Sequence, residues 1–181
     1  VMGDIYSLAA CNRVGSARLL DMMQEYQLAD LDDLGEHIIE TSKKAMLAEI
    51  SQLPTGTWRS EMRVDGVDEP LDIVTELEIE SNGIHVRFDG TSPVQPHGIN
   101  VPMSYTDAYT SFGVRCIIGP NIPNNAGSLE VIQVSAPLGC ILNAPRPAAV
   151  NLRHVMGQTL PGAVYGCLSH VLPAKGRAEG A

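Results

Sequence analysis

The residues with the clearest potential for chemistry lie in a loop that begins at Phe88-Asp-Gly-Thr-Ser92. This segment offers one carboxylate and two hydroxyl groups where a predicted strand ends, and such loops often present polar groups to a ligand. The same residue types also form ordinary Asp-Gly turns, in which Thr and Ser bind the local backbone. Asp89 is therefore a candidate catalytic residue, and turn formation is the favoured alternative.

Two further loops are rich in Asn and Gly, namely His97-Gly-Ile-Asn100 and residues 121–127. Asn125 is the second candidate catalytic residue, because its side chain could orient a substrate amide, and Asn100 is a candidate for binding substrate. Asparagines that lock a loop are the more common alternative. Neither loop has the glycine and lysine spacing of a phosphate-binding loop, so the sequence predicts no recognisable nucleotide cradle.

The pair Arg153-His154 precedes the last predicted helix in an apolar, small-residue context. A charged pair in such a place needs a partner, and a buried structural ion pair and a substrate contact are equally plausible. His154 is the third candidate catalytic residue, and Arg146 is the second candidate for substrate binding. The sequence contains no nucleophile-elbow motif and no histidine spacing suited to a metal, so we assign no metal ligand.

Helical and strand periodicities indicate which elements position these residues. Apolar residues recur at helical spacing over residues 4–27, which predicts either one helix or two, and again from Asp30 to Leu53. Because only two or three residues connect the two segments, they are predicted to form an antiparallel helix pair. Alternating patterns then predict strands over 57–64, 71–80 and 84–88. Asn82-Gly83 predicts a type I′ hairpin turn that pairs Glu80 with His85 and, further along, acid with base and apolar with apolar.

The second half of the chain is predicted to form helix, strand and helix. The helix spans about 104–118 with a capping box at its start, a polar loop follows over 121–127, and a buried strand spans about 130–135. The last helix begins near Pro161. This order predicts an α+β fold, with a helical pair over 1–54 and an α+β portion of the same domain over 55–181.

Composition restricts the classes of function. The chain has 181 residues and a net charge of −9, which disfavours nucleic acid and anionic membranes as partners. Its apolar runs are too short to span a membrane. The four cysteines are widely spaced, which predicts buried, reduced thiols in a cytoplasmic protein. Both ends read as interrupted, which predicts a segment of a longer chain.

Several short motifs occur together in a fixed order along the chain. They are Gly3-Asp-x-Tyr6-x-x-x-Ala10, Asp89-Gly-Thr-Ser-Pro93, Asn100-x-Pro102, Ile122-Pro-Asn-x-Ala-Gly127, Ala136-Pro-x-Gly139, Leu142-Asn143 and Pro147-Ala-Ala-Val150. In this order the chain resembles the B-type subunits of ATP-dependent hydantoinases and 5-oxoprolinases, a superfamily that also includes acetone and acetophenone carboxylase subunits. The resemblance covers nearly the whole chain.

The resemblance implies a central fragment of a longer subunit that hydrolyses a hydantoin or 5-oxoproline-like ring, together with an A-type subunit or domain that handles ATP. It also implies a divalent metal and a homo-oligomer for the full complex, whereas the fragment itself is expected to bind no cofactor and to be inactive alone. The alternatives are a subunit of an ATP-dependent ketone carboxylase and a non-catalytic structural module of such a complex.

Overall fold

The computed structural model describes residues 2–172, and the chain forms two compact units that meet at residues 38 and 39. The first unit contains helix α1, Met2–Glu25, and the beginning of α2, Asp32–Ile50. Helix α1 is continuous despite the central Gly15, and none of its residues is buried. The two N-terminal helices are thus confirmed, whereas their antiparallel packing and the division after residue 54 stay predictions.

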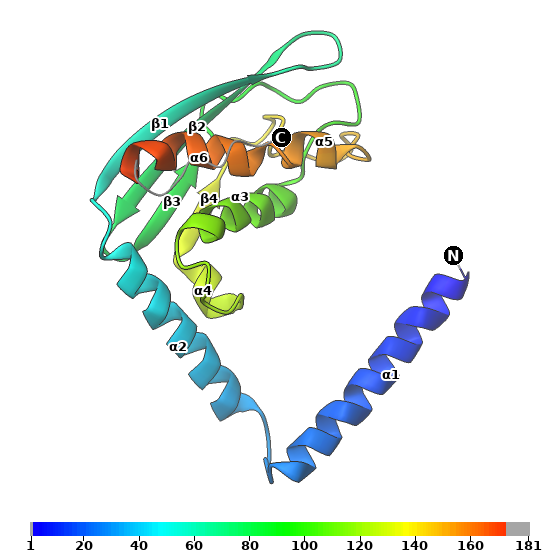
Figure 1. Cartoon of the computed structure of the whole chain (residues 1–181). Helices are drawn as coiled ribbons and strands as arrows, with labels where there is room; N and C mark the ends of the chain where they lie inside the picture. The colour runs from blue at the N-terminus through cyan, green and yellow to red at the C-terminus, as the bar shows by residue number, and fades with distance from the viewer. Residues whose placement is uncertain (1, 173–181) are drawn as a thin grey trace. The chain divides into compact units, whose positions relative to one another are not determined.

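The second unit is built on a four-stranded sheet (Figure 1). Its strands are β1, Gly56–Val64, β2, Leu71–Glu80, β3, Gly83–Arg87, and β4, Ile132–Ser135, and they lie side by side in that order. The first three form an antiparallel meander, as predicted, and β4 runs parallel to β3. The predicted α+β class is confirmed.

The predicted register of the β2–β3 hairpin is wrong by two positions. Gly83 is a strand residue opposite Glu80, so the turn consists of Ser81 and Asn82, and Glu78 faces His85. Asn82 and Gly83 do not have the positive φ angles that a type I′ turn requires. Because the shift is an even number of residues, each side chain keeps its predicted face, and apolar residues still face apolar ones.

In the described residues, the second unit also contains the rest of α2 and four further helices: α3, Met103–Ile117, α4, Ala126–Glu130, α5, Arg153–Gly157, and α6, Leu160–Val171. The predicted capping box at the start of α3 is absent, because the helix begins after Pro102 without a side-chain cap. Helix α4 lies where a loop and the start of a strand were predicted, and α5 lies in a segment for which no element was predicted. Each has only five residues, which is too short for a clear helical periodicity.

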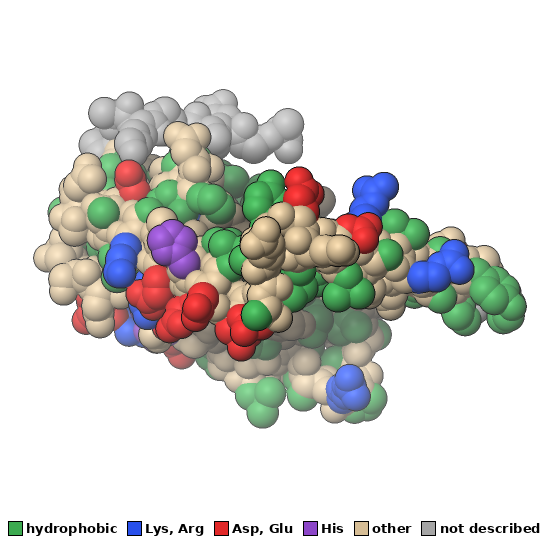
Figure 2. Space-filling model, turned by 90° about the horizontal axis from the view of Figure 1, so that it is seen from below, with side chains coloured by type: hydrophobic (Ala, Val, Ile, Leu, Met, Phe, Trp, Pro, Cys, Tyr) green, Lys and Arg blue, Asp and Glu red, His purple; other side chains and the backbone are tan. Residues whose placement is uncertain are grey.

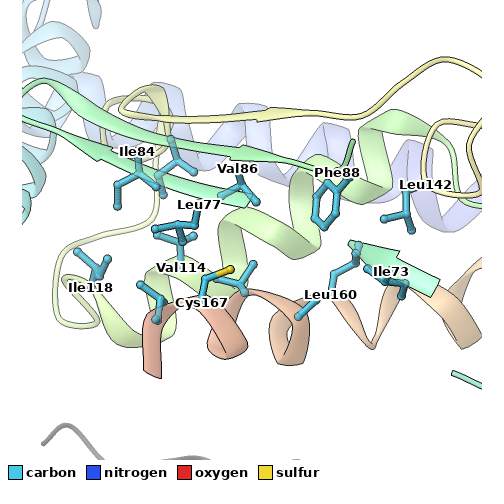
Figure 3. Packing of buried hydrophobic residues seen from close by; sticks show 14 of the residues in the cluster. Ile73, Leu77, Ile84, Val86, Phe88, Val114, Ile118, Leu142, Leu160 and Cys167 are labelled. Carbon is cyan, nitrogen blue, oxygen red and sulfur yellow. The ribbon is translucent and has the colours of Figure 1, made fainter. Parts of the chain in front are cut away.

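The core fills the space between the sheet and helices α3 and α6 (Figure 3). It includes Leu77, Val86 and Phe88 from the sheet side and Val114 and Leu160 from the helices, all fully buried. On the face shown in Figure 2, hydrophobic side chains reach the surface beside acidic and basic ones. No helix in the described part of the chain is long and apolar enough to cross a membrane.

The cysteines differ from the sequence expectation in one respect. Cys140 and Cys167 are buried, as predicted, but Cys11 and Cys116 are exposed. Cys11 lies on α1, which buries none of its residues, and this explains why an apolar sequence context did not lead to burial. All four thiols are free.

Candidate functional site

The Asp-Gly-Thr-Ser loop continues the hydrogen-bonding ladder of the sheet. The Val74 N–H donates to Oγ1 of Thr91 at 3.0 Å, and the Thr91 hydroxyl donates to the Val74 carbonyl at 3.2 Å. Oγ of Ser92 accepts from the Asp72 N–H at 2.9 Å. These two hydroxyls pair with backbone groups of β2 where β3 has already ended. Thr91 and Ser92 therefore have structural partners, but these lie on β2 and not in the local backbone of the predicted turn.

Asp89, in the same loop, is exposed. It lies near the buried Cys140 thiol, whose pKa is raised mainly by burial and, to a lesser extent, by the Asp89 carboxylate. A raised pKa keeps a thiol protonated and weakens it as a nucleophile. This arrangement therefore gives no activated cysteine at Cys140.

Asn100 is completely buried and holds the loop before α3. Its Nδ2 donates to the carbonyls of Gln95, His97 and Ala149 at 2.8, 2.9 and 3.0 Å. Its Oδ1 accepts from the Gln95 N–H at 2.7 Å. Its side-chain amide is thus occupied by the protein backbone, which matches the loop-locking alternative.

Asn125 is the N-cap residue of α4. Its Oδ1 accepts from the Ser128 N–H at 3.2 Å, and Oγ of Ser128 accepts from the Asn125 N–H at 3.0 Å, which forms a capping box. Its Nδ2 donates to the buried Ser42 hydroxyl on α2 at 2.7 Å. The side chain therefore joins α4 to the part of α2 that belongs to the same unit.

The expectation of a partner inside the protein for Arg153-His154 is only partly met. Both residues are exposed, so they do not form a buried ion pair. The Arg153 guanidinium lies 5.7 Å from the centre of the Tyr105 ring and donates to the Val150 carbonyl. Arg146 is also exposed and precedes a cis peptide bond to Pro147.

The five candidate residues predicted from the sequence are Asp89, Asn100, Asn125, Arg146 and His154. Within the described part of the chain, no hydrogen bond or ion pair joins any two of them. The described residues also contain no group of three His, Cys, Asp or Glu side chains that could hold a metal ion. Their roles in catalysis and substrate binding stay predictions.

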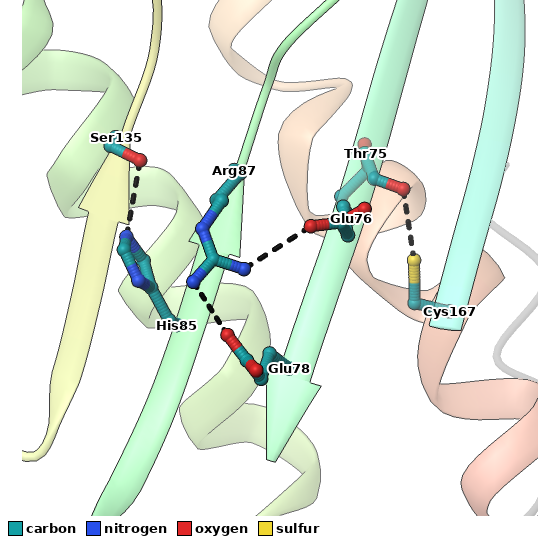
Figure 4. A network of polar contacts seen from close by, with 7 residues as sticks. All are labelled: Thr75, Glu76, Glu78, His85, Arg87, Ser135 and Cys167. Carbon is teal, nitrogen blue, oxygen red and sulfur yellow. Dashed lines mark hydrogen bonds and ion pairs between the residues drawn. The ribbon is translucent and has the colours of Figure 1, made fainter. Parts of the chain in front are cut away.

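A polar network covers the sheet face opposite α3 and α6 (Figure 4). Nη2 of Arg87 lies 2.5 Å from Oε2 of Glu78, and Nη1 lies 3.1 Å from Oε1 of Glu76. The two carboxylates raise the pKa of the guanidinium. His85 Nε2 lies 3.1 Å from Oγ of Ser135 on β4. The network joins β2, β3 and β4 through ordinary cross-strand partners, with one guanidinium shared between two carboxylates.

A cleft of about 820 Å³ runs along one face of α3. It is lined by Ser104, Asp107, Ala108, Ser111, Phe112, Arg115 and Cys116 from α3, and by Pro120, Ile122, Asn124, Leu129 and Ile132 from the segments that follow. Arg115 was not among the residues predicted from the sequence. The available signal was a lone arginine within the apolar run Phe112-Gly-Val-Arg-Cys-Ile-Ile118 of a helix.

Comparison with known proteins agrees with the motifs. The pattern that defines the Hydantoinase B/oxoprolinase family matches residues 1–181. A candidate B-type subunit of a D-/L-hydantoinase from Pseudomonas sp. (strain NS671) is 28% identical over 96% of the chain and 32% of that protein. The 5-oxoprolinase of Saccharomyces cerevisiae is 27% identical over 82% of the chain and 12% of that protein.

Solved structures share the fold. The ATP-dependent caprolactamase from Pseudomonas jessenii has a TM-score of 0.81 at 22% identity, over 90% of this chain and 29% of that one. The chain therefore spans about a third or less of the length of the proteins that it matches. Because the family pattern covers all 181 residues, the chain belongs to the Hydantoinase B/oxoprolinase family.

Proposed function

We propose that this chain is part of the B-type subunit of an ATP-dependent cyclic-amide hydrolase that opens a hydantoin or 5-oxoproline-like ring. The family match over the whole chain carries this proposal. It is supported by relatives named as 5-oxoprolinases and as a candidate B-type hydantoinase subunit, and by the fold shared with an ATP-dependent caprolactamase. An A-type subunit or domain is the proposed partner, in a cytoplasmic homo-oligomeric complex.

The chemistry of a cyclic amide explains the need for ATP. Resonance makes the ring carbonyl a poor electrophile, and transfer of the terminal phosphoryl group of ATP to the carbonyl oxygen makes the carbon a better target for water. Addition of one water and breakage of the carbon–nitrogen bond then give an acyl phosphate and a free ring nitrogen. A second water hydrolyses the acyl phosphate, which releases inorganic phosphate and leaves a ring-opened carboxylic acid. In this proposal the A-type partner performs the phosphorylation and the B-type subunit supports the hydrolysis.

The divalent metal of the full complex is proposed to bind outside the described residues, because these contain no suitable group of ligands. Asp89, Asn125 and His154 remain the candidate catalytic residues, and Asn100 and Arg146 the candidates for substrate binding. Each is tested by single substitution in the full-length subunit. Loss of turnover with normal folding and assembly would support a direct role for that residue.

A non-catalytic structural role for this segment is the second candidate function. It is favoured by Asn100 and Asn125, whose side chains are occupied by backbone and helix-cap contacts. Unchanged turnover and intact assembly after substitution of Asp89, Asn125 and His154 would support this role and argue against catalysis by these side chains.

The third candidate is ATP-dependent carboxylation of a ketone. The nucleotide-free acetone carboxylase structure shares the fold with a TM-score of 0.67 at 16% identity, over 75% of this chain and 20% of that one. Carboxylation consumes bicarbonate, whereas hydrolysis does not. Measuring whether turnover by the complete complex requires bicarbonate therefore distinguishes the two reactions.

A further inference from the structure

The cleft along α3 has the size and composition of a small-molecule site. Its volume of about 820 Å³ lies within the range of roughly 300–1,000 Å³ that is typical of ligand pockets. Ser104, Asp107, Ser111 and Arg115 follow one another at intervals of three or four residues and therefore share one helix face. Apolar side chains, including Phe112, contribute much of the remaining lining.

Arg115 is the unusual member of this lining. It is only 8% exposed, and its hydrogen-bonding groups meet few acceptors. Nη1 lies 2.6 Å from Sδ of Met46, a weak acceptor, and Nη2 donates to the carbonyl of Ile122. Nε is buried without any hydrogen-bond partner. The guanidinium thus retains unused donor capacity.

No carboxylate of the described residues forms an ion pair with Arg115. The acidic residue of the cleft, Asp107, instead accepts a long hydrogen bond of 3.4 Å from Ser111. Burial lowers the pKa of Arg115, but a guanidinium remains charged at neutral pH. A charge removed from water without a counter-charge is unfavourable, and an anion in the cleft would offset that cost.

The charge of Arg115 also selects the kind of ligand. A cation would be repelled by the guanidinium, whereas carboxylate and phosphate oxygens match its planar array of donors. Ser111 and Asn124 add uncharged polar groups to the cleft, and Phe112, Ile122 and Ile132 add apolar surface. This mixture suits a small molecule with an anionic group at one end and an apolar portion at the other.

We propose that the α3 cleft is a binding site for a small molecule that carries a carboxylate or a phosphate group, with its anionic oxygens bound by Arg115. The proposal goes beyond the proposed function because it holds whichever reaction the full complex performs. Its test is a direct binding measurement, so its failure is distinguishable from a failure to open cyclic amides.

The isoleucines of the cleft provide a local probe. The full-length protein, labelled with ¹³C at the isoleucine δ-methyl groups, is titrated separately with inorganic phosphate and with butyrate, and Ile122 and Ile132 are followed by NMR. Saturable shifts of both methyl signals are expected for at least one anion. The anion that causes them shows whether the cleft binds a phosphate group or a carboxylate group. Absence of saturable shifts, or shifts equal to those caused by sodium chloride at the same ionic strength, would overturn the proposal.

Substitutions then test the role of the guanidinium. Arg115→Gln should abolish the saturable shifts of the Ile122 and Ile132 methyl signals. Arg59→Gln, at an exposed arginine outside the cleft, should leave these shifts unchanged. Because Arg115→Gln can also disturb folding, a second pair of variants uses Phe112, which is 58% exposed. Phe112→Glu should weaken anion binding about tenfold through repulsion, and Phe112→Gln should not. Wild-type affinity in Phe112→Glu or in a folded Arg115→Gln would refute the assignment.

Discussion

Gly83 packs directly against the main chain of Val131. A Cβ atom at Gly83 would lie 2.7 Å from the Val131 carbonyl oxygen, closer than real Cβ contacts allow. The same oxygen accepts a hydrogen bond from the Ile84 N–H at 2.9 Å. Gly83 is therefore required for the close approach of β3 to the chain that enters β4, and its φ angle is not positive.

Gly83→Val should destabilise the second unit by roughly 1–3 kcal/mol, because the side chain would force β3 away from residue 131. The measurement is the free energy of unfolding from denaturant titration. Gly15→Val is the control with the same change of residue, since no atom lies within 4 Å of a Cβ at that position and Val and Gly differ little in helix propensity. Equal stability of Gly83→Val and wild type would contradict the described packing of β3.

Thr91→Val tests whether the Asp-Gly-Thr-Ser loop is structural. The substitution keeps the shape of the side chain but removes both hydrogen bonds to Val74, which leaves buried backbone groups unpaired. A loss of about 1–3 kcal/mol in the free energy of unfolding is expected. The same change at the exposed Thr57 should have almost no effect. A Thr91→Val protein with wild-type stability but no turnover would instead indicate a ligand contact.

The Arg63–Asp72 pair should make stability depend on acid pH. Two hydrogen bonds of 2.8 and 2.9 Å from Arg63 lower the pKa of Asp72 below its ordinary value of 3.8. Because the pKa of Asp72 is lower in the folded protein than in the unfolded chain, its ion pair with Arg63 stabilises the folded state above pH 3.8. This stabilisation is lost as the pH falls through the pKa that Asp72 has in the folded protein. Both side chains are largely exposed, so the effect is small and decreases with salt.

The measurement compares Arg63→Gln with wild type by unfolding at several pH values and low salt. The stability difference should be present at neutral pH and should shrink below pH 3.8. In an Asp72→Asn background, Arg63→Gln should have no pH-dependent effect. A difference that grows on acidification would rule out this ion pair as its source.

Thiol reactivity should divide the cysteines into two classes. Cys11 and Cys116 are exposed, whereas Cys140 and Cys167 are buried. Burial raises the pKa of Cys167 to about 11 and also raises that of Cys140, so both remain protonated at pH 8. Alkylation with iodoacetamide, followed by peptide mass spectrometry, should modify Cys11 and Cys116 first. Modification of Cys167 in the native protein at the rate of Cys11 would contradict this burial, and denaturation should equalise all four rates.

The sequence predicted elements that have a strong local period. The β1–β2–β3 meander and helices α3 and α6 follow from the spacing of apolar residues, since each buries one face against the same core. The hairpin register was not predictable in this way. The Asn82-Gly83 pair fits a type I′ turn, but the contact between Gly83 and Val131, almost fifty positions away, determines where the strand begins.

The candidate site shows a similar division. The sequence indicated that Asn100 and Asn125 either contact substrate or hold their loops in place. The structure shows that the Asn100 amide binds backbone carbonyls and that the Asn125 amide caps helix α4. Arg115 was not predicted because a single charged residue on a helix is usually solvated. Its burial depends on Met46 and on the turn at Ile122, and sequence spacing does not bring these together.

The most direct test of the proposed function is ring opening by the complete complex of the full-length B-type subunit with its A-type partner. Purified complex is incubated with 5-oxoproline or a hydantoin, with and without ATP, and the ring-opened product and ADP are quantified. The proposed function predicts product only when ATP is present, in proportion to the ADP formed and without consumption of bicarbonate. ATP-independent ring opening, or ATP-dependent turnover of a ketone with bicarbonate and none of a cyclic amide, would contradict it.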